Sequence, residues 1–381
     1  MQSQLLDIVG VLAKNSNQII TGKFMKDIKD ILTQALYDLY EYESKNGKNT
    51  YQEYTEADFR TYVQESVDSI LPKLSFYFID DSILKFNTES DDIFFKSHNK
   101  QWGTLIEKLE RFISFSVFVG SEINEEFRLS ASETNDVMFD VLIKLHARAS
   151  LASNEILCLI KNGYPDAALS RWRSLYDILV IFISIFTYGP ECAEKFYHHH
   201  IVDKFNNLNK SKQAKDNYPE KYKDLVVDDD QAKQTEELYN YLLTTYGKKY
   251  RFDYGWLDGF VEPSNKNGKI TFADIEKTLS LDHYAPYSKI ASQNIHASSQ
   301  SLILNLATNG SSYDQLCVGR SSLGAKVPIE GLTLCMFQIT ANLLNYFSTK
   351  DNKIFLAMLH YHFKNIMNFL SDDKLSLRQN L

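Results

Sequence analysis

Residues 159–182 read LIKNGYPDAALSRWRSLYDILVIF, and this stretch decides the fold. The apolar residues that lead into it recur every three or four positions, a pattern that predicts a helix over residues 132–161. Gly163 suits the left-handed position just beyond a helix end. Pro165 and Asp166 suit the first turn of a second helix, where an acidic side chain meets the positive end of the helix dipole. The sequence therefore predicts a tight pair of helices.

Similar spacing predicts helices in several other parts of the chain, within residues 1–70 and over residues 102–119, 329–347 and 353–370. Gly120 and the acidic residues that follow it indicate a break after the second of these. Over residues 75–86 the aromatic and β-branched content leaves strand and helix both open. We therefore predict an all-α, multi-helix bundle with an N-terminal helical region at residues 1–128 and a main helical bundle domain at residues 129–381.

The composition fits a protein with a packed core and limits its partners. Hydrophobic residues make up 44% of the 381 residues, and the formal net charge is -8. An acidic chain does not favour an extended DNA-binding surface, because nucleic-acid affinity comes mainly from Lys and Arg, although a small basic cleft stays open. The most apolar run, residues 178–186, is about half of the roughly 20 residues that cross a bilayer. We interpret it as a core helix and predict no membrane partner.

No motif predicts a metal or a cofactor. The chain has no GxxxxGK[ST], GxGxxG or GxSxG sequence. Residues 198–200 are three consecutive histidines, but neighbouring helical side chains point about 100° apart and do not converge on one ion. The four cysteines are far apart and form no CxxC pair, and no signal peptide is recognisable at the start of the sequence. The expected location is the cytoplasm, and the expected cofactor is none.

A charged pair stands out on the second helix of the predicted pair. Arg173 and Asp177 are four residues apart and share one face of a largely apolar helix. One interpretation is a structural ion pair, since Arg and Asp are seldom buried without a partner. The other is a functional pair, because Arg supplies a permanent positive charge that suits a phosphate.

A second polar pattern lies in the stretch LDHYAPYSKIASQNIHASSQSLI at residues 281–303. Ser288, Ser292 and His296 recur every four residues and should line one helical face. Histidine suits proton transfer near neutral pH, so His296 together with Arg173 predicts metal-free cleavage of RNA. The alternative is a histidine whose role is packing or capping.

Three segments together resemble a known bacterial family. They are the run at residues 159–182, YGWLDGF at residues 254–260 and ITFADIEKTLSLDHYAPYSKIASQNIHASS at residues 270–299. Over roughly residues 130–345 the chain is similar to the family catalogued as domain of unknown function 5677. Members of that family commonly have Glu where this chain has Asp177. The change keeps the charge and shortens the side chain by one methylene.

The helical pattern of that family is in turn similar to the HEPN superfamily, which includes RNA-cleaving toxins and antiphage effectors and often works as dimers. This resemblance implies an HEPN-like core and a homodimer. The usual HEPN signature, Arg followed by four to six residues and then His, is absent. Arg173 and His296 would therefore have to meet from different helices. The residues that this hypothesis assigns to the site are Arg173, Asp177 and His296 for catalysis and Tyr284, Ser288, Ser292 and Trp256 for binding.

Two functions follow as hypotheses. The first is an HEPN-like, metal-independent ribonuclease or toxin effector of antiphage defence. In it His296 moves the ribose proton and Arg173 stabilises the developing charge on the phosphate. The second is a non-catalytic helical module of a defence system that senses or binds a protein, with Arg173, Asp177 and His296 serving as a buried polar network. The partner is accordingly RNA or a protein.

Overall fold

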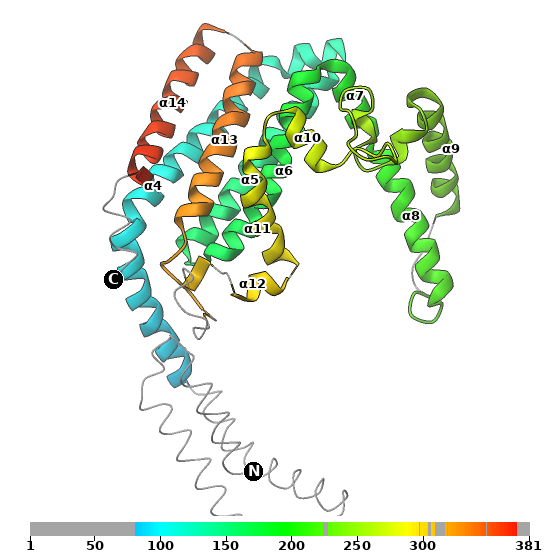
Figure 1. Cartoon of the computed structure of the whole chain (residues 1–381). Coiled ribbons are helices and arrows are strands. Elements are labelled where there is room, and N and C mark those ends of the chain that lie inside the picture. Colours follow the sequence, from blue (N-terminus) through cyan, green and yellow to red (C-terminus); the bar gives the residue numbers. More distant parts are fainter. Residues whose placement is uncertain are drawn as a thin grey trace, which may run out of the picture. The chain divides into compact units, whose positions relative to one another are not determined.

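The computed structural model describes residues 81–223, 228–296, 298–303, 306–308, 317, 319–347 and 349–371. Every regular element in these residues is a helix and none is a strand (Figure 1), which confirms the all-α prediction. The helices predicted within residues 1–70 lie outside the described residues. The sequence left strand and helix both possible over residues 75–86. Of these, residues 81–86 belong to helix α4, Asp81–Thr134.

The chain divides into two compact units, residues 1–103 with 304–323 and residues 104–303 with 324–381. In the first unit, the indole nitrogen of Trp102 donates to the Ser322 carbonyl at 2.7 Å, and Arg320 forms an ion pair with Asp91 at 2.8 Å. This unit also holds the short 3-10 helix η4, Leu306–Thr308. The division predicted at residue 128 stays a prediction, and α4 runs without interruption through that position.

The predicted break at Gly120 is wrong, because Gly120 lies within α4. A Cβ atom at this position would lie 2.5 Å from the imidazole of His146. Gly120 therefore serves a close approach between α4 and the next helix rather than a helix end. α4 ends instead at Thr134, and the next residue, Asn135, has a positive φ of 53°. The Asp136 carboxylate then accepts a hydrogen bond from the Phe139 amide at 2.9 Å and caps the next helix.

The predicted helix pair is confirmed as α5, Val137–Lys161, and α6, Pro165–Tyr188. Gly163 has a φ of 75°. The Gly163 and Tyr164 amides donate to the carbonyls of Ile160 and Leu159 at 3.0 and 2.9 Å, which is the Schellman pattern at a helix end. Pro165 occupies the first turn of α6, as its missing N–H predicts.

The two predicted C-terminal helices are confirmed as α13, Lys326–Tyr346, and α14, Lys350–Ser371. α13 packs on α5 and α6, and α14 packs on α13 (Figure 1). The core between these helices contains large side chains that are fully buried, among them Phe139, Trp172, Tyr176 and Phe182. The most apolar run of the sequence, residues 178–186, lies in α6 and supplies part of this core.

Among the described helices, α13 alone has the length and apolar composition that could cross a membrane. Within its most apolar window, 56% of the residues are buried inside the bundle. A buried core helix of a helical bundle meets the same criteria of length and composition. The packing of α13 against α5, α6 and α14 gives it this role in the fold.

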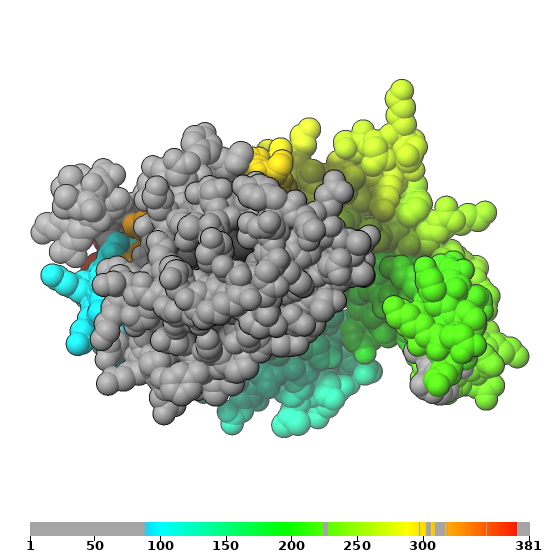
Figure 2. Space-filling view, turned by 90° about the horizontal axis from the view of Figure 1, so that it is seen from below, coloured from blue at the N-terminus to red at the C-terminus, as the bar shows by residue number. Residues whose placement is uncertain are grey.

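A second group of helices follows α6. It consists of α7, Pro190–His198, α8, His200–Asn217, α9, Asp229–Tyr246, and the 3-10 helices η1, Lys248–Arg251, and η2, Gly255–Leu257. α8 and α9 pack on each other, and the atoms of α8 (green) form a separate projection in Figure 2. The polar stretch at residues 207–217 is the exposed end of α8.

Four further elements follow η2 in the chain. They are α10, Phe272–Thr278, η3, Asp282–Tyr284, α11, Ala285–Ile295, and α12, Ser299–Ile303. α10 begins with a capping box in which Thr271 and Asp274 bond each other's backbone amides. Both α10 and α11 contact α6. This arrangement brings the Ser288–Ser292 stripe of α11 alongside the Arg173 region of α6.

Candidate functional site

Arg173 is held on three sides by α6, α10 and α11. Its Nη1 donates to Asp177 Oδ1 one turn along α6, and its Nε donates to Ser292 Oγ on α11 at 3.3 Å. The guanidinium carbon lies 4.5 Å from the centre of the Phe272 ring on α10, within the range of a cation–π interaction. The Arg173 side chain is only 16% exposed. The ion pair predicted from the four-residue spacing is therefore present, with partners from two further helices.

Asp177 lies at the open edge of this group, with 42% of its side chain exposed. Burial raises the pKa of the Asp177 carboxyl, and the neighbouring Arg173 cation offsets only part of that rise. Partial burial thus works against the charged form of Asp177. Arg173 is the cation that keeps the carboxylate partnered.

A buried acid and a phenol lie next to Arg173. The Tyr176 hydroxyl donates to Glu276 Oε1 at 2.8 Å and approaches the Leu281 carbonyl at 3.1 Å. Burial raises the pKa of Glu276, partly offset by the hydrogen bond from Tyr176 and by the charge of Arg173. Burial and the Glu276 carboxyl also raise the pKa of Tyr176. The polar group around Arg173 consequently contains a second carboxyl that the sequence did not point to.

Phe272, Glu276 and Tyr254 are the residues that sequence analysis missed. Burial is the largest cause of the raised pKa of Tyr254. The nearby Asp177 carboxylate raises this pKa further. The ring of Tyr254 also contacts Phe272, at 6.2 Å between centres. All three are separated from Arg173 by about 80 to 100 positions in the chain. A helical spacing rule relates residues of one helix only, so it contains no signal for them.

Ser292 on α11 links Arg173 to the backbone of Ser288 through two hydrogen bonds. Ser292 Oγ accepts from Arg173 and donates to the Ser288 carbonyl at 2.9 Å. Ser288 is buried, while His296 is exposed and follows α11 as its C-terminal cap. The imidazole of His296 makes no hydrogen bond or ion pair with any residue that the structure describes. The structure brings Arg173, Asp177 and Ser292 together, and it does not bring His296 into this contact.

The direction of α11 explains the position of His296. Tyr284 at the start of α11 packs on Tyr176, with ring centres 5.5 Å apart, and Asn294 near its end donates to Asp166 at 3.4 Å. α11 therefore runs antiparallel to α6. His296 lies beyond Ser292 in the direction of the N-terminus of α6, whereas Asp177 lies in the opposite direction.

The other two predicted binding residues have packing roles. The Tyr284 hydroxyl accepts a hydrogen bond from Gln338 on α13 at 3.2 Å. Trp256 is buried in η2 and packs edge-on against Phe196 of α7, with ring centres 4.9 Å apart. Among the described residues, no hydrogen bond or ring contact joins Trp256 to Arg173, Asp177 or Ser292. In the described part of the chain, Tyr284 contacts the ring of Tyr176, the neighbour of Glu276.

The consecutive histidines at residues 198–200 do not share one environment, because His199 and His200 contact different backbone carbonyls. Buried His199 contacts the Tyr250 and Phe252 carbonyls at 3.1 and 2.9 Å, whereas His200 contacts the Tyr197 carbonyl at 2.7 Å. In the part of the chain that the structure describes, no group of three His, Cys, Asp or Glu side chains could hold a metal ion.

One comparison with known proteins bears on this arrangement. Residues 139–313 match the model of DUF5677, a family of unknown function. The matched DUF5677 region is less than half of the 381-residue chain, and it is narrower than the resemblance drawn from the sequence motifs. It runs from α5 to just beyond α12, so it contains Arg173, Asp177, Glu276 and Ser292. No curated protein and no solved structure matches the chain.

Proposed function

We propose that this chain is a non-catalytic helical module of a bacterial defence system that recognises a protein partner. The observation on which the proposal depends is the engagement of Arg173 with Asp177, Ser292 and Phe272 at once. The defence setting follows from the HEPN-like resemblance of the helical pattern. In this proposal, Arg173 joins α6 to α10 and α11 and thereby stabilises the DUF5677 region.

Phosphodiester cleavage makes a different demand on these residues. It needs a donor aimed at the developing charge and a base within hydrogen-bond reach of the attacking hydroxyl. The guanidinium of Arg173 already donates to two partners, and the carboxyls of Asp177 and Glu276 lie beside it. An anionic substrate would have to displace Asp177 and approach both acids. This geometry favours a structural role for Arg173.

Three exposed apolar side chains lie on α14. Ile354, Met358 and Tyr361 are 58%, 43% and 65% exposed. Their spacing of four and then three residues places them on one stripe of the helix. Exposed apolar stripes of this kind are typical of surfaces that bind another protein. We propose this α14 stripe as the surface that the partner contacts.

The stabilising role of Arg173 can be measured by urea unfolding of Arg173→Met. Methionine keeps an apolar stem of similar length and removes the charge. The variant should lose about 1–3 kcal/mol of unfolding free energy, because Asp177 and Ser292 lose a charged partner and Phe272 loses its cation. His296→Ala should change the unfolding free energy by less than about 0.5 kcal/mol, as is usual for an exposed residue.

Arg111→Met provides a matched control. Arg111 also pairs with an acid four residues away on its own helix, Glu107, but the two side chains are 74% and 69% exposed and 4.0 Å apart. Exposed pairs of this kind contribute about 0–1 kcal/mol. If Arg173→Met were as stable as Arg111→Met, the Arg173 contacts would not stabilise the fold and the proposal would lose its basis.

A ribonuclease is the second candidate, and the exposure of His296 is the observation that favours it. His296 follows Ser292 by one helical turn, about 6 Å along the axis. Its imidazole has no partner among the described residues and is accessible to a substrate. In this HEPN-like alternative, RNA binding would have to draw Arg173 away from Asp177 toward a phosphate next to His296. Total-RNA integrity separates the two candidates.

A further inference from the structure

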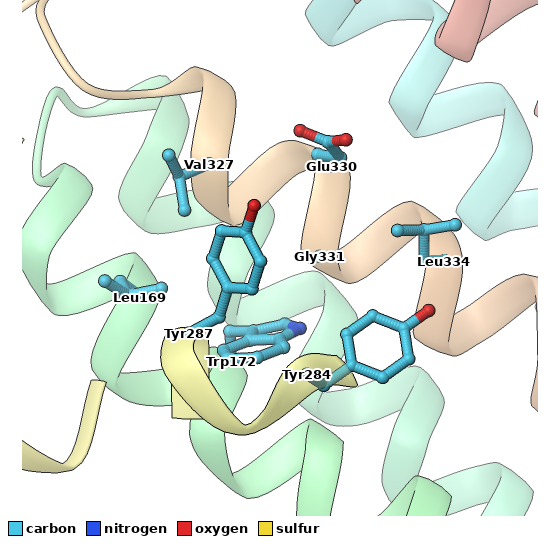
Figure 3. Close-up of a pocket in the computed structure, with 8 residues that line it drawn as sticks. All are labelled: Leu169, Trp172, Tyr284, Tyr287, Val327, Glu330, Gly331 and Leu334. Carbon is cyan, nitrogen blue, oxygen red and sulfur yellow. The ribbon is translucent and has the colours of Figure 1, made fainter. Parts of the chain in front are cut away.

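A small aromatic cavity lies between α6, α11 and α13. Figure 3 shows Tyr287 on α11 and Tyr284 at the end of η3, Trp172 of α6 behind them, and Glu330 on the facing helix α13. Leu169, Val327, Gly331 and Leu334 complete its walls. We call this cavity the aromatic pocket. None of the residues assigned to catalysis lines it.

Gly331 makes room for the indole that forms the base of the pocket. A Cβ atom at residue 331 would lie 2.5 Å from Trp172 Nε1 and 2.8 Å from Trp172 Cε2, closer than side-chain carbon atoms approach. Trp172 is 1% exposed. Its ring also stacks on Tyr176, with ring centres 5.4 Å apart, so packing from both sides fixes the indole in place.

The size of the aromatic pocket suits a compact head group. Its volume is about 60 Å³, whereas one water requires roughly 10–15 Å³ by the same measure. Drug-sized ligands occupy cavities of roughly 300–1,000 Å³. The pocket therefore accepts a group of a few heavy atoms, with the rest of the molecule outside.

Charge gives the pocket a preference among compact groups. Glu330 is the only carboxylate in its lining, which contains no Lys, Arg or His. Glu330 forms no ion pair with any described residue, including Lys326, one turn earlier on α13. Aromatic rings attract cations through their electron-rich faces, and a nearby carboxylate adds to this attraction. An anion would meet repulsion from Glu330, and a neutral group would gain no attraction between opposite charges.

We infer that the aromatic pocket binds a methylated ammonium head group. Its methyl groups contact Trp172, Tyr284 and Tyr287, and Glu330 compensates its charge. Aromatic side chains arranged around a cation are a recurring solution for quaternary ammonium ligands, which offer no N–H for hydrogen bonds. This inference is independent of the role of Arg173 and goes beyond the proposed protein-binding function.

The experiment compares choline with 3,3-dimethylbutan-1-ol, its uncharged analogue of the same shape, by calorimetric titration of the full chain at fixed ionic strength. Choline should bind at least about tenfold more tightly, as expected for a desolvated cation–π contact. Tyr287→Leu should weaken choline binding about tenfold, and Glu330→Gln severalfold. Tyr287 is half-exposed, so its replacement should leave the fold intact, and thermal unfolding checks this.

Tyr241→Leu is the matched control, because Tyr241 is an exposed tyrosine of α9 outside the pocket. It should leave choline affinity unchanged. Equal affinity for the two probes, no choline binding, or equal losses in Tyr287→Leu and Tyr241→Leu would each overturn the inference. A parallel arm with phosphatidylcholine vesicles distinguishes the sources of the head group, because only a lipid ligand would bring the chain down with the vesicles.

Discussion

At the scale of single residues, His146 is an imidazole that the core keeps neutral. It is 3% exposed, and its Nε2 lies 3.1 Å from Thr340 Oγ1 on α13. Burial lowers the pKa of His146 from its usual 6.5 to about 4. Between these two values the unfolded chain binds a proton that the folded chain does not. The unfolding free energy should therefore fall as pH decreases from about 6.5 to about 4, by up to ~3 kcal/mol.

Urea unfolding between pH 7.5 and 4.5 measures this loss. Carboxyl groups also titrate in the lower part of that window, so the comparison is with His146→Gln, which keeps a polar group and cannot gain the proton. The variant should be less stable at pH 7.5 and should lose less stability on acidification. Parallel pH dependence in the two proteins would show that His146 does not cause the loss.

The residues around Arg173 show how far sequence can go at this scale. The Arg173–Asp177 pair follows from one helical spacing, and the same rule placed Ser288 and Ser292 on one face. The contacts of Glu276 and Phe272 with α6 could not be predicted from the sequence, because α7, α8 and α9 separate these residues from α6 in the chain. The position of His296 depends on the direction in which α11 crosses α6, which no local pattern encodes.

At the scale of elements, the two glycines of α4 allow a paired test. A Cβ atom at Gly120 would lie 2.5 Å from the imidazole of His146, whereas one at Gly103 would lie 3.9 Å from its nearest neighbour. Alanine favours a helix over glycine by about 1 kcal/mol. Gly103→Ala should therefore raise the unfolding free energy by about 0.5–1 kcal/mol. Gly120→Ala should lower it by about 1–3 kcal/mol through overpacking, as measured by urea unfolding.

Opposite signs for the two substitutions are the essential result. If both variants gained stability, α4 and α5 would have to be farther apart at Gly120 than the structure places them. The same glycine explains an error in the sequence analysis. A glycine that ends a helix and one that admits a neighbouring side chain look alike in sequence. By contrast, Gly163 was interpretable because Asn162 and Pro165 flank it with end and start signals.

At the scale of the whole molecule, the apolar stripe of α14 predicts association. The homodimer predicted from the sequence remains a proposal, and the α14 stripe is the surface that we propose for the partner. We expect the chain to sediment as a dimer and Met358→Glu with Tyr361→Glu to sediment as a monomer with unchanged helicity. A dimer that survives these substitutions would place the contact elsewhere. A wild-type monomer would contradict the homodimer, and the proposed partner of the stripe would then be a different protein.

The all-α class, the α5–α6 pair and the two C-terminal helices followed from apolar periodicity, because each helix of a bundle must bury one face. The two compact units were beyond sequence analysis. The first joins residues 1–103 to residues 304–323, and such a pairing of distant segments depends on tertiary contact. The DUF5677 match covers residues 139–313, but the function of that family is unknown. The function of this region therefore has to be inferred from its residues.

The most direct test of the proposed non-catalytic role is total-RNA integrity after induced expression in bacteria, with and without phage challenge. The wild type is compared with Arg173→Met and with His296→Ala, each checked for folding. We predict intact RNA in all cells without phage, and the same RNA pattern for wild type and His296→Ala during challenge. RNA fragmentation that the wild type causes and that folded His296→Ala abolishes would contradict the account and establish the ribonuclease.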